Sequence, residues 1–160
     1  MMAVQTSYTV DQEDRIVGMQ ADSAPAMIES FFAETEIPFG AAVVLGTADN
    51  QVKLAEAGGQ IAGIALRAHT IPLEASGTDS YKVGDPVAVL REGNAFVEVT
   101  VDVDNGETAY AVASGVNQGN ATITSSGTLG PLGTFQETVT AGGLAKLAVR
   151  MPSPALADPT

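Results

Sequence analysis

Apolar residues occupy alternate positions from Val87 to Val103, which is the clearest pattern in the chain. Such alternation is typical of strands that have one face in a core and the other in water. Within this segment Glu92-Gly93-Asn94 predicts a turn between two strands, and Asp104-Asn105-Gly106 predicts a second turn at its end. The pattern therefore indicates antiparallel β-structure in the middle of the chain.

Short apolar runs bounded by turn-forming residues predict further strands. They are residues 41–45, 52–55, 61–66, 108–113, 121–124, 133–139 and 144–150. Gly63 lies inside one of these runs and predicts a β-bulge there. About eight short strands at intervals of roughly 8–12 residues predict an all-β fold, either a small β-barrel or a jelly-roll-like sandwich.

Residues 24–32 have the spacing of a helix instead of a strand. The apolar residues that would share one helical face are Ala24, Met27, Ile28, Phe31 and Phe32. Asp22 or Ser23 could cap such a helix, and Pro25 is tolerated in its first turn. Two interpretations stay open. One is a short helix that covers an open end of the barrel, and the other is an extended segment that carries the two phenylalanines to a neighbouring subunit.

The start of the N-terminal leader alternates again, with Val4, Thr6, Tyr8 and Val10 on one side of an extended chain. This pattern predicts a strand. It is either an edge strand of the protein's own sheet or a strand that adds to the sheet of another chain, where backbone hydrogen bonds supply the affinity.

The chain divides into three zones. Residues 1–34 are predicted to form an extended N-terminal arm with the short helix, residues 35–151 a β-barrel body, and residues 152–160 a Pro-rich C-terminal tail. Prolines exclude a central strand or a helix interior in the tail. The predicted fold is therefore all-β with an extended arm.

The charge of the chain argues against two classes of partner. The 160 residues include 19 Asp and Glu but only seven Lys and Arg, which gives a net charge of −12. Binding to nucleic acid requires a basic surface that neutralises phosphates, and an anionic membrane repels an acidic protein in the same way. We therefore predict neither nucleic acid nor membrane as a partner.

The sequence offers no pattern of catalytic or metal-binding residues. It has no cysteine, and its one histidine, His69, is predicted to be a loop or subunit-contact residue. No two of the 17 glycines form G-x-G, so the dinucleotide-binding fingerprint is missing. Asp102, Asp104 and Asn105 predict a solvated hairpin tip. We therefore predict no catalytic residue, no cofactor and no metal, and a protein that is not an enzyme.

Several segments, in order along the chain, resemble the structural cement, or head decoration, proteins of tailed bacteriophages. They are Gly18-Met19-Gln20-Ala21-Asp22-Ser23, residues 37–44 (IPFGAAVV), residues 61–65 (IAGIA), residues 81–89 (YKVGDPVAV) and residues 142–149 (GGLAKLAV). The resemblance spans residues 17–150.

This resemblance implies a β-barrel or jelly-roll-like body that forms a homodimer or homotrimer. It further implies many copies on the outer surface of an expanded phage head, made in the host cytoplasm. There the protein would stabilise the head by bridging neighbouring major capsid proteins. An acidic chain without catalytic residues suits such a role.

We expect the contacts with capsid protein or with neighbouring subunits to come from apolar residues in the first forty positions. They are Val4, Tyr8, Val10, Met27, Phe31, Phe32, Ile37 and Phe39. A tail-tube or baseplate structural protein and a trimeric β-fold enzyme are the alternative functions. The sequence leaves open dimer versus trimer, and whether the arm pairs with capsid protein or with another copy.

Overall fold

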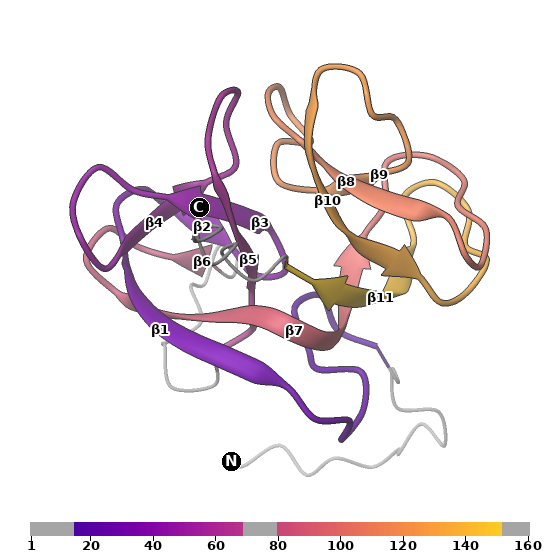
Figure 1. Ribbon diagram of the computed structural model, residues 1–160, viewed down its shortest axis with the longest axis horizontal. Helices are drawn as coiled ribbons and strands as arrows, with labels where there is room; N and C mark the ends of the chain where they lie inside the picture. Colours follow the sequence, from indigo (N-terminus) through magenta and orange to yellow (C-terminus); the bar gives the residue numbers. More distant parts are fainter. Residues whose placement is uncertain (1–14, 69–79, 152–160) are drawn as a thin grey trace, which may run out of the picture.

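The computed structural model describes residues 15–68 and 80–151. Within these ranges it has eleven β-strands and no helix, which confirms the all-β prediction (Figure 1). The strands are β1 (Met27–Ala33), β2 (Ile37–Pro38), β3 (Ala42–Leu45), β4 (Gln51–Leu54), β5 (Ile61–Ala65), β6 (Ser80–Tyr81), β7 (Pro86–Glu98), β8 (Thr108–Val112), β9 (Ala121–Thr122), β10 (Thr128–Phe135) and β11 (Leu144–Arg150). The predictions for the leader, for His69 and for the tail (152–160) lie outside the described residues.

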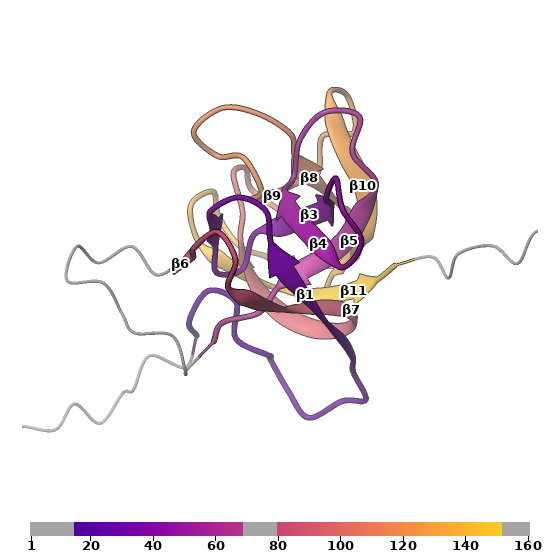
Figure 2. The same ribbon diagram turned by 90° about the vertical axis from the view of Figure 1, so that its left-hand side faces the viewer.

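The long strand β7 belongs to two parts of the molecule. Its first half pairs with β1 and β5, and its second half pairs with β11. Because β1 pairs with both β4 and β7, the order β1-β4-β3-β5-β7 closes into a five-stranded barrel. The order then continues from β7 through β11, β10 and β8 to β9. Figure 2 views the molecule from the barrel side, with β1, β3, β4 and β5 at the front.

Two hydrophobic cores lie on opposite faces of the barrel wall. One fills the barrel and includes Val43, Val87 and Val89. The other lies between the barrel and the second group of strands and includes Val44 and Leu147. Neighbouring residues of β3 thus point into different cores, which explains why the buried positions Ala42, Val43 and Val44 are all apolar.

The predicted helix over residues 24–32 is wrong, because Met27–Ala33 forms strand β1. Its residues pair antiparallel with β7, from Met27 opposite Glu92 to Phe32 opposite Pro86. The helical spacing arose from two adjacent apolar pairs, which in a strand place one side chain on each face. Phe31 packs against the barrel core, whereas Phe32 is exposed. Of the two interpretations, the structure supports an extended segment.

The predicted turn at Glu92-Gly93-Asn94 is also wrong, because β7 continues through it. At this point β11 takes the place of β5 on one edge of β7, and Gly93 has a φ of +138°. A Cβ atom on Gly93 would lie 3.0 Å from the Cβ of Ala26, so the glycine permits a close approach of the chain that enters β1. The bulge at Gly63 is confirmed by a register shift opposite Val43 and Val44.

Candidate interaction surface

The segment that precedes β1 is fixed to the second half of β7. The N–H groups of Gly18 and Ala21 donate to the carbonyls of Phe96 and Asn94, both at 2.9 Å. Gly18 has a φ of +80°, and a Cβ atom there would lie 2.8 Å from the backbone nitrogen of Gly40. Two segments that resemble the cement family, residues 18–23 and 37–44, therefore contact each other at Gly18 and Gly40, where a larger side chain would not fit.

Asp22 fixes the end of this segment. Its Oδ2 lies 2.8 Å from Lys146 Nζ and accepts a hydrogen bond of 2.8 Å from Asn94 Nδ2. Its Oδ1 accepts the N–H of Ala24 at 3.0 Å. These contacts, with that of Lys146 the largest, lower the pKa of Asp22 from 3.8 to about 2. The predicted helix cap therefore directs the chain into strand β1.

The exposed apolar side chains on one side of β1 and in the turn beside its end are here called the β1 face. They are Ile28, Phe32 and Val83, which are 45%, 54% and 71% exposed, and Ile28 and Phe32 project from the same side of the strand. Met27 is 53% exposed on the opposite side of β1. Val83 is held near the end of β1, because Gly84 N–H donates to the carbonyl of Ala33 at 2.8 Å. The β1 face is thus built on a strand and a turn whose backbones are hydrogen-bonded in place.

The structure divides the expected contact residues into three groups. Met27 and Phe32 are exposed on opposite sides of β1, Phe32 as part of the β1 face, and Phe31 is half-buried against the barrel core. Ile37 and Phe39 are buried, at 0% and 3% exposed, so both serve the core in this fold. The remaining three, Val4, Tyr8 and Val10, lie outside the described residues.

Ile37 and Phe39 are held in the core by Tyr81. Ile37 of β2 pairs with Tyr81 of β6, and the rings of Phe39 and Tyr81 meet edge to face at 5.0 Å. The Tyr81 hydroxyl donates to the carbonyl of Leu66, and burial raises the pKa of Tyr81. The Arg67 guanidinium lies over the Phe39 ring at 5.3 Å. The IPFG segment therefore acts as a core element of the barrel.

Sequence reasoning missed two exposed apolar residues in turns. Val83 lies in the turn before β7, and Val116 lies fully exposed in the loop between β8 and β9. The sequence did contain a signal for them, which is a valine between turn-forming residues. Val116, for example, lies between Gly115 and Asn117, and nothing in such a turn requires an apolar side chain.

One backbone edge of β1 is also open. Phe32 N–H donates to the carbonyl of Asn50 at 2.8 Å, on the side of β4. However, β4 pairs with β1 only at Phe32 and Ala33, and no other described strand pairs with residues 27–31 on that side. We call this the open edge of β1, and residues 27–30 are exposed along it.

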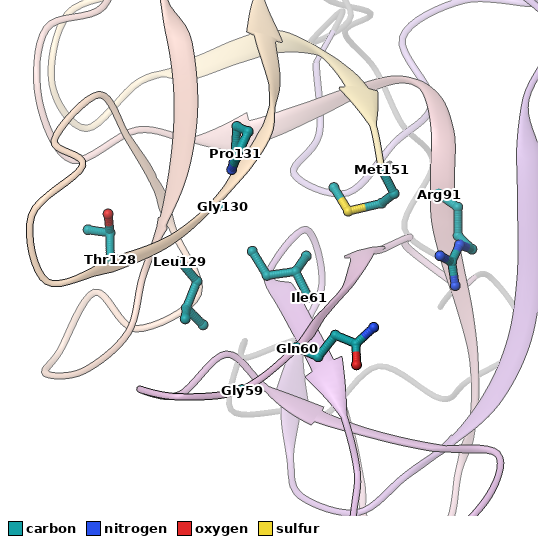
Figure 3. A pocket seen from close by; sticks show the side chains of 9 residues that line it. All are labelled: Gly59, Gln60, Ile61, Arg91, Thr128, Leu129, Gly130, Pro131 and Met151. Atoms are coloured by element: carbon teal, nitrogen blue, oxygen red, sulfur yellow. The ribbon is translucent and has the colours of Figure 1, made fainter. Parts of the chain in front are cut away.

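A pocket of about 340 Å³ lies between the barrel and β10 (Figure 3). Its apolar lining comes from Ile61, Leu129, Pro131 and Met151. Arg91 lies on its rim and places a guanidinium nitrogen 3.6 Å from a carboxylate oxygen of Glu29 on β1.

The described residues contain no group of three or more His, Asp or Glu side chains that could hold a metal. The residues at the predicted hairpin tip have structural partners instead. Asp102 Oδ1 accepts the N–H of Ala141, and Glu107 Oε2 accepts the N–H of Asp104, both at 2.8 Å. Within the same residues, no helix is long and apolar enough to span a bilayer.

Comparison with solved structures shows that the fold occurs in phage particles. A chain from the capsid of Myoviridae phage XM1 is 21% identical, with a TM-score of 0.74 over 93% of this chain and 98% of that chain. The head fibre gp8.5 N base of bacteriophage phi29 is 18% identical, with a TM-score of 0.45 over 78% of this chain and 94% of that chain. No curated protein matches the chain.

The class of protein follows from a family model that matches most of the chain: the protein is a structural component of a phage capsid and hence of the virion. Residues 4–150 match the family described as structural cement protein (E217 gp24/Pam3 gp6). The chain belongs to this family, as its segments of resemblance indicated. The family is one of structural proteins and not of enzymes.

Proposed function

We propose that the protein is a cement that binds the outer surface of an expanded phage head and bridges neighbouring major capsid proteins. The observation that carries this proposal is the β1 face, an apolar surface on a chain with a net charge of −12. Clustered exposed apolar side chains are typical of surfaces that bind another protein. The acidic charge suits a position away from the packaged DNA.

Stabilisation of the head would follow from mass action. A protein that binds the assembled shell but not its separated subunits shifts the equilibrium towards the shell. Each copy then needs to contribute only a few kcal/mol, since many copies act on one particle and a copy that contacts two capsid proteins gains from avidity. The β1 face suits this task because its strand is held along β7 before any partner arrives.

The proposal is tested by replacing Ile28 and Phe32 together with serine. Both side chains are about half exposed, so the fold should be unaffected. The matched control is Val116→Ser, which removes an exposed apolar side chain from the loop between β8 and β9. We expect the double variant to lose most of its occupancy on purified expanded heads, measured by co-sedimentation, and the control to bind as wild type.

Two outcomes would contradict this function. One is full occupancy of the heads by the double variant, which would show that the β1 face does not contact the capsid protein. The other is assembly of the purified chain into rings or tubes without heads, which is the behaviour of a tail-tube protein. The melting temperature of each variant shows that a loss of binding is not a loss of folding.

A further inference from the structure

We propose that the open edge of β1 binds an extended, basic segment of the major capsid protein as an added β-strand. The inference rests on the proposed function, under which the β1 face contacts capsid protein, and it goes further in two respects. It adds backbone hydrogen bonds to the side-chain contact, and it specifies the chemistry of the partner segment. That segment carries apolar side chains at alternate positions and a lysine or arginine on its opposite side.

The backbone groups on β1 are oriented for strand addition. Phe32 N–H points away from β7 towards the carbonyl of Asn50, and Ala33 N–H points the other way, towards the carbonyl of Asp85. Because backbone groups alternate along a strand, the N–H and C=O of Ile28 and Ser30 point to the same side as those of Phe32. An extended chain beside β1 would therefore meet these donors and acceptors in hydrogen-bonding orientation.

The open edge lacks the features that usually protect an edge strand. Native proteins discourage pairing at such edges with prolines, lysines, bulges or covering segments. Strand β1 contains no proline and no lysine, and its register with β7 is regular from Ile28 to Phe32. β4 lies beside only Phe32 and Ala33, so an added strand would continue the row that β4 begins. The remaining length, residues 27–31, corresponds to about 16 Å of extended chain.

One side of the added strand would cover the β1 face. Ile28 and Phe32, 45% and 54% exposed, project from the same side of β1, and the small side chain of Ser30 lies between them. Side chains that share a face of neighbouring strands lie about 5 Å apart, and apolar pairs in such positions stabilise the pairing. A partner with apolar residues at alternate positions would bury both side chains. Backbone pairing and burial of the β1 face then belong to one contact.

The other side of the added strand would lie beside Glu29. The side chain of Glu29 is 47% exposed, and its carboxylate lies 3.6 Å from a guanidinium nitrogen of Arg91, which is too far for a hydrogen bond. Because Arg91 belongs to β7, it contacts Glu29 from the side away from the open edge. A lysine or arginine on the added strand would contact the carboxylate from the open side, and opposite charges on neighbouring strands stabilise their pairing.

Segments of this chain itself fit the open edge less well. A second β1 strand that paired antiparallel and centred on Glu29 would place two glutamates opposite each other, which destabilises the pairing. The leader, residues 1–14, contains Asp11, Glu13 and Asp14 and no lysine or arginine. The charge at the edge therefore favours a basic segment of another protein.

The first experiment measures hydrogen exchange at single amides of β1, in the free protein and on purified expanded heads. We expect the amides of Ile28 and Ser30 to exchange rapidly in the free protein and at least about tenfold more slowly on heads, where the added strand accepts their hydrogen bonds. The amides of Glu29 and Phe31 face β7 and should be protected in both samples. The amide of Val116, in an exposed loop, is the control and should exchange equally in both.

A matched pair of variants tests the backbone contact by binding. Ser30→Pro removes the N–H that faces the open edge and keeps the backbone groups of Glu29 and Phe31, and proline is tolerated at such a position of an edge strand. Ser30→Ala removes the hydroxyl and keeps the N–H. In co-sedimentation titrations with expanded heads, we expect the apparent Kd of Ser30→Pro to be at least about tenfold above that of Ser30→Ala. Equal melting temperatures of the two variants show that folding is unaffected.

Glu29→Gln tests the charge of the partner, and Glu98→Gln, at the exposed far end of β7, is its control. We expect the apparent Kd on heads to rise about two- to fivefold for Glu29→Gln and to stay unchanged for Glu98→Gln. The difference should shrink as salt is added, because ions screen exposed charges. An equal Kd for both variants at low salt would contradict a basic partner.

Three further results would overturn the inference. Equal binding by Ser30→Pro and Ser30→Ala, with binding lost in the Ile28→Ser/Phe32→Ser variant, would show a side-chain contact without an added strand, and the cement function would stand. Slow exchange of Ile28 and Ser30 in dilute free protein would assign the edge to a segment of the same chain. Slow exchange that appears only in concentrated free protein would assign it to a second copy. Wild-type protein that does not bind heads would instead refute the proposed function itself.

Discussion

Strands β1 and β3 belong to the same five-stranded barrel and are both rich in apolar residues, yet their surroundings differ. β3 has a core on each face, and Ala42, Val43 and Val44 are all fully buried. β1 has a core on one face only, and Ile28 and Phe32 on its other face remain exposed. The comparison shows that an apolar strand in this protein is either buried on both faces or left exposed on one, according to whether the chain covers its second face.

The largest expected effect comes from a charge on the buried strand. Val44→Asp places a carboxylate in a core without a partner, which should destabilise the fold by more than about 4 kcal/mol. We expect the variant to be insoluble or unfolded by circular dichroism. Its control, Val44→Ala, should lose about 2 kcal/mol in urea denaturation. A folded Val44→Asp protein with wild-type stability would show that β3 is not buried on both faces.

A smaller effect is expected at Asp22, which fixes the chain before β1. Its pKa is lowered to about 2, so the charged form stabilises the fold above the unfolded pKa near 3.8, and this contribution is lost as the pH falls through 2. We expect Asp22→Asn to be less stable than wild type at neutral pH. The difference in unfolding free energy should shrink between about pH 4 and about pH 2.

The measurement for Asp22 is urea denaturation of both proteins across this pH range. Asp49→Asn, in the turn between β3 and β4, serves as the control for the loss of one negative charge. A difference between wild type and Asp22→Asn that stays constant down to pH 2 would contradict the assigned contacts with Lys146 and Asn94.

The smallest effect on stability is expected on β1 itself. Phe32→Asp places a charge where the side chain is already 54% exposed, so the free energy of unfolding should change by less than about 0.5 kcal/mol. Urea denaturation beside Val44→Ala tests this directly. A loss as large as that of the core variant would mean that the β1 face is covered within the folded monomer.

Part of the fold could be predicted from period-two patterns. The alternation around Val97 and the runs at 41–45 and 144–150 identified strands that the structure contains. Strands β2 and β6 have two residues each, too few to carry a period. The sequence predicted a helix at β1 because its adjacent apolar pairs fit both the helical period of 3.6 residues and the strand period of two. Only the pairing of this segment with β7 decides between the two.

The site residues were harder to predict for a related reason. Ile37, Phe39 and Phe32 are all large apolar residues near one another in the chain. Tyr81, from a distant segment, covers the first two, whereas nothing in the described chain covers Phe32 to the same extent. A single sequence does not state which segments meet, so exposure could not be assigned. The family resemblance does not separate buried from exposed residues.

The antiparallel register of β1 on β7 has a mechanical consequence. A force that pulls β1 along its own axis would load all of its hydrogen bonds to β7 at the same time. A force perpendicular to the sheet would break the same hydrogen bonds one after another. A shell that swells under internal pressure mainly stretches within its own surface. If β1 lies flat on such a shell, the force acts along the strand axis. This is the direction in which the hydrogen-bonded pairing of β1 with β7 resists force best.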